Sequence, residues 1–123
     1  MVGKITKEKI YEIMMGNLPV GFSIVDKDGV IVDFNHVAEM ITGFTRSEVI
    51  GQSHFHVLHG TPAKEACPLL KHALFKHEGI VETESTITNK NGDLVIISVT
   101  AFPLIDDEGI FIGGLCFHQI FPL

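Results

Sequence analysis

The chain has 123 residues, of which 46% are hydrophobic and 20% charged. This length and composition suit one globular domain with its own core and exclude a disordered segment or a repeat array. The net charge of −6, without a Lys/Arg cluster, argues against direct binding to nucleic acid. No apolar run approaches the roughly 20 residues that cross a bilayer, and no signal peptide is present, so we expect a cytoplasmic protein without membrane contact.

The first half of the chain predicts a helix followed by a β-hairpin. Thr6 can cap a helix that carries Ile10, Ile13 and Met14 at helical spacing. Two β-rich runs, residues 20–25 and 30–34, flank the turn at 26–29, which ends in glycine. This arrangement is typical of a hairpin.

The middle of the chain predicts short helices. Asn35 can cap the first, which Gly43 ends, and Thr45 with Glu48 forms a capping box for the second. Residues 52–66 show no clear period and are expected to be irregular. A longer helix is predicted from Cys67-Pro68 to Gly79. One of its faces would carry Leu70, Ala73, Leu74 and His77.

The last third predicts three strands, residues 80–88, 94–104 and 110–120, separated by turns at 89–92 and 106–109. The expected fold class is therefore α+β, with five antiparallel strands in one sheet and the short helices on one face. Alternation along the strands makes both faces of this sheet apolar. The N-terminal helix, a partner or both would have to cover the second face.

This layout resembles a PAS domain, over residues 18–117. The residues that carry the resemblance are Val20-Gly21-Phe22-Ser23-Ile24-Val25-Asp26 with Gly29, Asn35 with Ala38, Gly43-Phe44-Thr45 with Glu48 and Gly51, Asn91-Gly92, Gly109, and Ile112-Gly113-Gly114. The resemblance implies a sensory and dimerisation module of the kind found in histidine kinases, cyclic-nucleotide enzymes and transcription activators. It divides the chain into an N-terminal helix at 1–16, a sensory core at 17–119 and a tail or linker at 120–123.

PAS domains hold a small molecule or cofactor between the sheet and the helices, or hold nothing there. The residues that we expect to line such a ligand pocket are Ser23, Val25, Leu74, Ile97, Val99, Leu115 and Phe117. A weakly polar metabolite would suit this lining. A core filled by its own side chains is the alternative, and the domain would then only join two chains.

A flavin is not expected in this pocket. The light-sensing relatives carry a cysteine in an Asn-Cys-Arg-Phe motif, and this chain has Ser53-His54-Phe55-His56 there. They also hold the flavin ring with amide side chains, where the alignment places Ile87, Ile97 and Leu115. These aliphatic side chains cannot form hydrogen bonds.

A metal or a haem remains open. His54, His59 and Cys67 are possible metal ligands, and a subset of PAS domains has Cys, His-Gly and Cys-Pro at the matching places, with His54 here replacing the first cysteine. The alternative is that these residues have ordinary loop and capping roles. For haem, the candidate ligands are His72 and His77 on the predicted helix.

The expected function is that of a signal-transduction module that senses a small molecule, a metal or a redox input. The alternative is a scaffold without ligand. Catalysis is not expected, because the paired carboxylates lie in turns and no nucleophile or phosphate motif is present. A homodimer is expected to use these residues: Ile10, Ile13, Met14, Phe22 and Ile24. The usual Asp-Ile-Thr junction is missing at the C-terminal end, so the chain either belongs to a longer protein with an output domain or acts alone.

Overall fold

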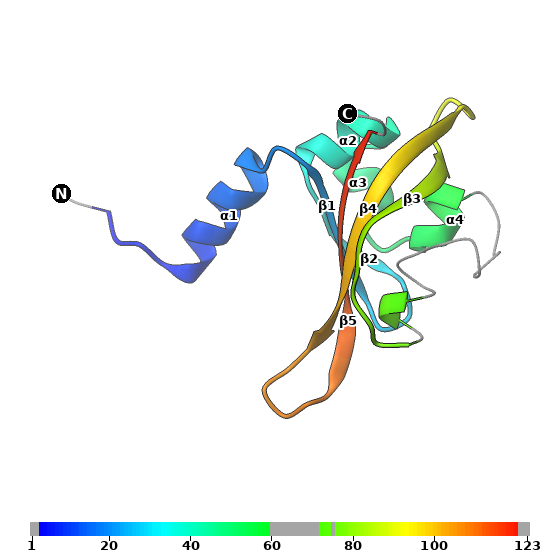
Figure 1. Ribbon diagram of the computed structural model, residues 1–123. Coiled ribbons are helices and arrows are strands. Elements are labelled where there is room, and N and C mark those ends of the chain that lie inside the picture. The colour runs from blue at the N-terminus through cyan, green and yellow to red at the C-terminus, as the bar shows by residue number, and fades with distance from the viewer. Residues whose placement is uncertain (1–2, 60–71, 75, 121–123) are drawn as a thin grey trace.

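The computed structural model describes residues 3–59, 72–74 and 76–120 (Figure 1). Its elements, in chain order, are α1 (Lys7–Asn17), β1 (Gly21–Asp26), β2 (Ile31–Phe34), α2 (His36–Thr42), α3 (Arg46–Val49), α4 (His54–His59), β3 (Ile80–Thr88), β4 (Leu94–Ile105) and β5 (Phe111–Ile120). The strands form one antiparallel sheet in the order β2-β1-β5-β4-β3. The predicted α+β class and the five-stranded sheet are confirmed.

The three hairpin turns are built alike. In each, the Oδ1 atom of Asp26, Asn89 or Asp106 accepts hydrogen bonds of 2.9–3.1 Å from the N–H groups two and four residues further on. The glycine that ends each turn has a φ between 81° and 86°, which a residue with a Cβ rarely adopts. The turns that the sequence predicted therefore set the strand pairing locally.

Asn35 ties the start of α2 to β1. Its Oδ1 accepts from the N–H of Ala38, at 3.0 Å, and from the N–H of Phe22, at 2.8 Å. Its Nδ2 donates to the carbonyl of Val20, at 3.0 Å. The side chain is 4% exposed, so it meets three backbone groups that would otherwise be buried without partners.

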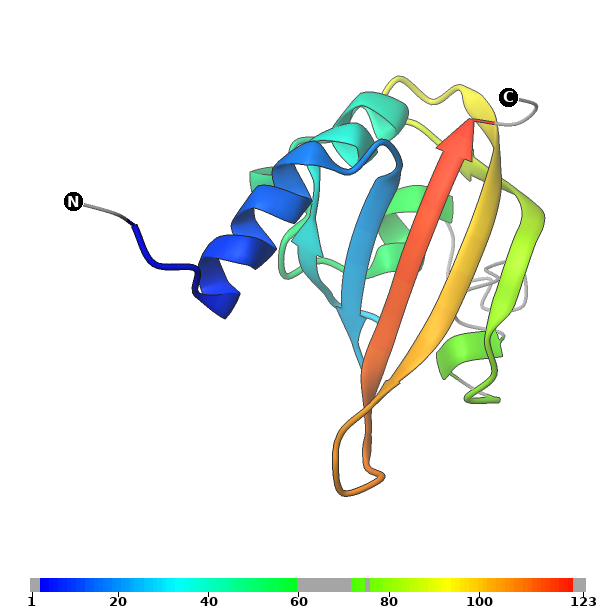
Figure 2. The same ribbon diagram turned by 60° about the vertical axis from the view of Figure 1, so that its left-hand side comes forward.

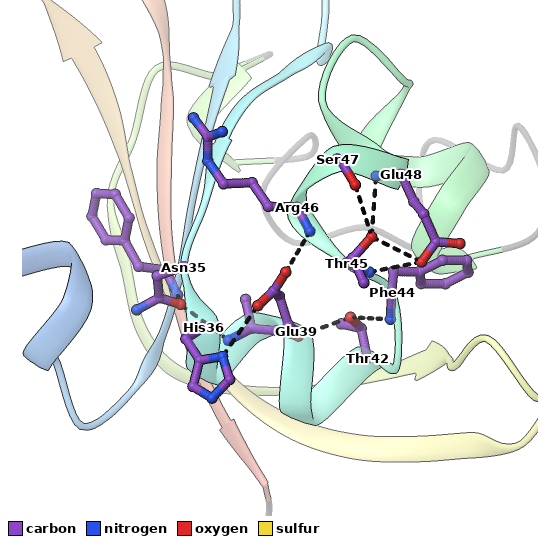
Figure 3. Close-up of polar contacts among 11 residues, drawn as sticks. Asn35, His36, Glu39, Thr42, Phe44, Thr45, Arg46, Ser47 and Glu48 are labelled. Atoms are coloured by element: carbon purple, nitrogen blue, oxygen red, sulfur yellow. Dashed lines mark hydrogen bonds and ion pairs between the residues drawn. The ribbon is translucent and has the colours of Figure 1, made fainter. Parts of the chain in front are cut away.

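The α2–α3 corner is held by a chain of polar contacts (Figure 3). His36 Nδ1 lies 3.1 Å from Glu39, whose second carboxylate oxygen accepts from the N–H of Arg46 at 2.6 Å. Thr45 and Glu48 form the predicted capping box of α3. These contacts fix the helices that cover one side of the sheet.

The helices α2, α3 and α4 lie on one face of the sheet, which we call the inner face (Figure 1). The core lies between this face and these helices. Its buried hydrophobic residues include Val25, Ile31, Phe34, Ala38, Val49, Leu58, Leu74, Ile87, Ile97, Val99 and Ala101.

The helix α1 lies on the other side but does not cover the outer face of the sheet, which is open in Figure 2. None of its residues is buried, and Ile10, Ile13 and Met14 are all exposed. The helix alone therefore does not cover the second face, where Phe102 is 41% exposed although Phe22 is buried. The physical reason is that a hydrogen bond holds α1 beside the edge strand β2: the Tyr11 hydroxyl donates to the carboxylate of Asp33.

Two predictions for the middle of the chain also need correction. The stretch that was expected to be irregular contains the helix α4. Its sequence, which includes three histidines, showed no pattern that predicted a helix. The longer helix does not reach Gly79: residues 72–74 form a helical turn, whereas residues 76–79 are not helical and His77 has a φ of 54°. Cys67, Pro68 and Leu70 lie outside the described residues. Among the described helices, none is long and apolar enough to cross a membrane.

Candidate functional site

Strand register decides which side chains reach the interior. In the β1–β5 pair, Ser23 lies opposite Cys116 and Gly21 lies opposite His118. In the β4–β5 pair, Val99 lies opposite His118. Directly opposed residues of an antiparallel pair share a face, so Cys116 and His118 lie on the inner face together with Ser23 and Val99.

The same register corrects part of the expected pocket lining. Leu115 lies opposite Ile24, and Phe117 lies opposite Phe22, with the two phenyl rings 5.3 Å apart. Both side chains therefore lie on the outer face, and their predicted inward placement is wrong by one residue. The reason is that β5 alternates between two apolar sets, so hydrophobicity alone did not choose the face.

The other expected lining residues do lie in the interior. They are Ser23, Val25, Leu74, Ile97 and Val99, all of which are buried. Their role in ligand binding stays a prediction. The sequence reasoning missed Cys116 and His118. Beside the 106–109 turn Ile105 lies opposite Phe111, and only after a shift in register between Leu104 and Ile105 do odd-numbered residues of β4 pair with even-numbered residues of β5. Counting outward from the turn would therefore have given the wrong face.

Three buried polar side chains, which we call the interior polar cluster, face the interior from β1, β5 and α4. They are Ser23, His54 and His118, which are 0%, 5% and 2% exposed. Ser23 Oγ, His54 Nδ1 and His118 Nε2 have no hydrogen-bond partner among the described residues. Such atoms are uncommon in folded proteins, because each costs about 1–3 kcal/mol when it is left unsatisfied.

Burial keeps both histidines of the cluster uncharged. It lowers the pKa of His54 to about 3, and the neighbouring His59 and His118 lower it further. It also lowers the pKa of His118 to about 4. The effect of His118 on His54 shows that the two rings are close enough to interact, although they come from opposite sides of the interior. His118 Nδ1 lies 4.0 Å from Cys116 Sγ.

The metal prediction is tested only in part, because Cys67 lies outside the described residues. His54 and His59 both lie on α4, with ring centres 6.0 Å apart. His59 is half-buried, and burial lowers its pKa although its ring hydrogen-bonds to the backbone of Thr86. Within the described ranges, no three His, Cys, Asp or Glu side chains are placed to hold a metal ion. A metal site that includes Cys67 stays a prediction.

The side chains present do not fit a flavin. Ile87 and Ile97 are buried and aliphatic, and Leu115 faces outward, so none of the three holds a flavin edge. Of the two expected haem ligands, His77 is exposed, and its ring stacks on Phe111 with the ring centres 3.9 Å apart. His77 therefore does not face the sheet from a helix, as the haem interpretation required. His72 is half-buried in the helical turn at 72–74, and its role as a haem ligand stays a prediction.

A sheet with one face under short helices, and with polar groups buried beneath them, is the design of a small sensory domain. The chain belongs to the PAS family, because the family model described as PAS fold matches residues 9–121. PAS domains are sensory and signalling modules and are generally not catalytic. The predicted resemblance is confirmed.

Solved structures show the same fold at low sequence identity. A PAS domain from Colwellia psychrerythraea is 17% identical with a TM-score of 0.78, and the match covers 94% of this chain and 98% of that one. VqmA bound to DPO is 20% identical with a TM-score of 0.67, covering 96% and 59%. The light-state dimer of the fungal blue-light photoreceptor Vivid is 18% identical with a TM-score of 0.71, covering 96% and 97%. No curated protein matches the chain.

The neutral histidines predict a loss of stability in mild acid. Because the folded protein holds His54 and His118 uncharged, the unfolded chain binds more protons once the pH falls below about 6.5. The free energy of unfolding is therefore highest above that pH and decreases as the pH is lowered toward the pKa values of the two histidines in the folded protein. The expected slope is about 1 kcal/mol per pH unit for each histidine.

Urea unfolding, carried out between neutral pH and the onset of carboxylate protonation, measures this slope. The substitution His118→Phe should reduce the slope. The substitution His56→Phe, at an exposed position, should leave it unchanged. An equal slope in the two variants would contradict it.

Gly21 is expected to set the position of the His118 ring. A Cβ at residue 21 would lie 2.4 Å from His118 Nε2, which is closer than any tolerated contact. Gly21→Ala should therefore displace the imidazole and destabilise the protein by about 1–3 kcal/mol. The measurement is a double-mutant cycle in urea unfolding with His118→Ala. If Gly21→Ala costs as much in the His118→Ala background as alone, the two residues do not interact and the prediction fails.

Proposed function

We propose that this PAS domain is the sensor of a histidine kinase or transcription-regulator type protein and binds a small molecule at the interior polar cluster. The observation that carries the proposal is that Ser23, His54 and His118 each bury a polar atom without a partner among the described residues. A ligand with polar groups of its own would satisfy these atoms and be held in place by them. The neighbour solved as VqmA bound to DPO supports this reading by showing that the same fold has been found with a bound molecule.

Binding would act by shifting a conformational equilibrium. A ligand that fits one packing of the sheet against α4 better than another increases the population of that packing. No catalytic step is part of this proposal. Asp26 and Asp106 use their Oδ1 atoms to hold turns, as the sequence suggested for the paired carboxylates. The cytoplasmic location stays a prediction.

Ser23→Ala separates a binding role from a structural one. Removing a buried hydroxyl that has no protein partner should leave the thermal midpoint of the ligand-free protein unchanged or raise it. The same change should weaken ligand binding, because it removes one of the groups that the ligand meets. Native mass spectrometry of the untagged protein, before and after incubation with a small-molecule cell extract, gives the bound fraction for wild type and variant.

Thr42→Ala is the matched control for this experiment. Thr42 is also fully buried, but its hydroxyl donates to the carbonyl of Ala38 at 2.8 Å, so its removal should destabilise the protein. A Ser23→Ala protein that loses as much stability as Thr42→Ala would contradict the proposed role of Ser23. Absence of any bound molecule in wild type would favour the scaffold function instead.

Homodimerisation through the outer face is the second part of the proposal. Ile24, Phe102, Leu115 and Phe117 form an apolar outer patch, and Ile96 lies on the same face near the start of β4, where it is 46% exposed. α1 exposes its own stripe on the same side of the sheet. A second copy would cover both surfaces at once, and the Vivid neighbour was solved as a dimer.

Ile96→Glu is expected to shift the dimer to monomer, because two-fold symmetry brings a new buried charge from each subunit into the interface. Analytical ultracentrifugation over a range of concentrations measures the equilibrium. Met40→Glu, at an exposed site on α2, is the control and should keep the dimer. A wild-type protein that remains monomeric at the highest concentration would overturn the homodimer, and a dimer that survives deletion of residues 1–15 would remove α1 from it.

A further inference from the structure

The residue types in the interior polar cluster indicate which charge a bound ligand would have. It joins one hydroxyl and two imidazoles from three separate elements, β1, α4 and β5. Ser23 and His118 are diagonal neighbours across the β1–β5 pair, and His54 comes from the helix above them. The three groups therefore border the interior between the sheet and α4.

In the part of the chain that the structure describes, no charged side chain is buried with this cluster. Among the described residues, the buried polar side chains are Ser23, Asn35, Thr42, His54, Ser85 and His118, with no Asp, Glu, Lys or Arg. Both cluster histidines are buried, at 5% and 2% exposed, where the charged form of an imidazole would lose its hydration. An ionised ligand would lose its hydration here and gain no countercharge in return, which is strongly unfavourable.

The polar atoms of the cluster offer both kinds of hydrogen bond. A serine hydroxyl donates and accepts, and a neutral imidazole has one donating and one accepting nitrogen. The surrounding core is aliphatic, with Val25, Leu58, Ile97 and Val99 all buried. This lining suits a ligand that has an apolar body and one polar edge with both a hydrogen-bond donor and an acceptor.

We propose, resting on the ligand-binding function above, that the domain selects an uncharged small molecule with an apolar body and an amide-like or hydroxyl-bearing edge. Selection arises because a polar ligand forms hydrogen bonds with the cluster, whereas an anion or a cation meets no buried countercharge among the described residues. The class is thus defined by charge and by hydrogen-bonding pattern.

Three probes of nearly equal shape test this selection: benzamide, benzoate and benzamidine, which at neutral pH are uncharged, anionic and cationic. Each is titrated into the ¹⁵N-labelled full chain, and dissociation constants are taken from the backbone amide shifts of α4 and β5. Benzamide should bind, and the two charged probes should bind at least about tenfold more weakly. His118→Phe, which keeps ring bulk but removes the polar edge, should weaken benzamide about tenfold, and His56→Phe should not.

The outcomes separate this inference from the function on which it rests. Tighter binding of benzoate or benzamidine, lost in His118→Phe, would overturn the charge selection and leave the sensor function standing. The compound retained from the cell extract gives an independent reading: an uncharged compound supports the inference, and an ionised one overturns it. If neither a probe nor an extract compound binds, both the inference and the proposed sensor function fail, and bound water would account for the polar atoms.

Discussion

The pairing of β1 with β5 is the constraint on which the interior depends. It places Ser23 and His118 on the inner face, and a shift of one residue would exchange them for Phe22 and Phe117. Glycine permits the close approach of these strands, because a Cβ at Gly113 would lie 2.2 Å from the carbonyl oxygen of Val25. Gly21, at the other end of the pair, leaves room for the imidazole.

A single amide side chain then sets the helices against this strand pair. Asn35 binds the backbone at Phe22 of β1 and at Val20 just before it, while it caps α2 at Ala38. The start of α2 therefore cannot move without breaking these hydrogen bonds. Because the bonds to Phe22 and Ala38 are buried, water cannot replace them, so the start of α2 stays fixed against the start of β1.

The parts of the fold that could be predicted are those set by neighbouring residues. The turn side chains Asp26, Asn89 and Asp106 and the capping residues Asn35 and Thr45 act within four residues of themselves, so the sequence pattern contains their partners. The face of β5 depends on a register with two other strands. There Leu115 and Phe117 are more hydrophobic than Cys116 and His118, and the apolar outer face misled the prediction.

The position of α1 was unpredictable for a similar reason. Its apolar stripe suggested packing on the sheet, but a polar contact decides its place. The Tyr11 hydroxyl binds Asp33, whose other carboxylate oxygen is 2.9 Å from Arg46 Nε. Burial opposes ionisation of Asp33, yet the hydrogen bonds from Tyr11, Arg46 and the backbone of Phe34 outweigh it and hold its pKa below the usual value. Nothing in the spacing of these residues signals that they meet.

Alternation along β5 gives a physical route between the proposed ligand site and the proposed dimer surface. His118 and Cys116 face the interior, while Phe117 and Leu115, bonded directly to them, face the outer patch. A ligand that binds the His118 imidazole can be met by rotation of the ring alone or by a shift of the backbone of residue 118. Where the backbone shifts, the edge contact between Phe117 and Phe22 on the opposite side changes with it. Close packing does not absorb such a shift gradually, so one strand can carry the state of the interior to the surface where a second copy would bind.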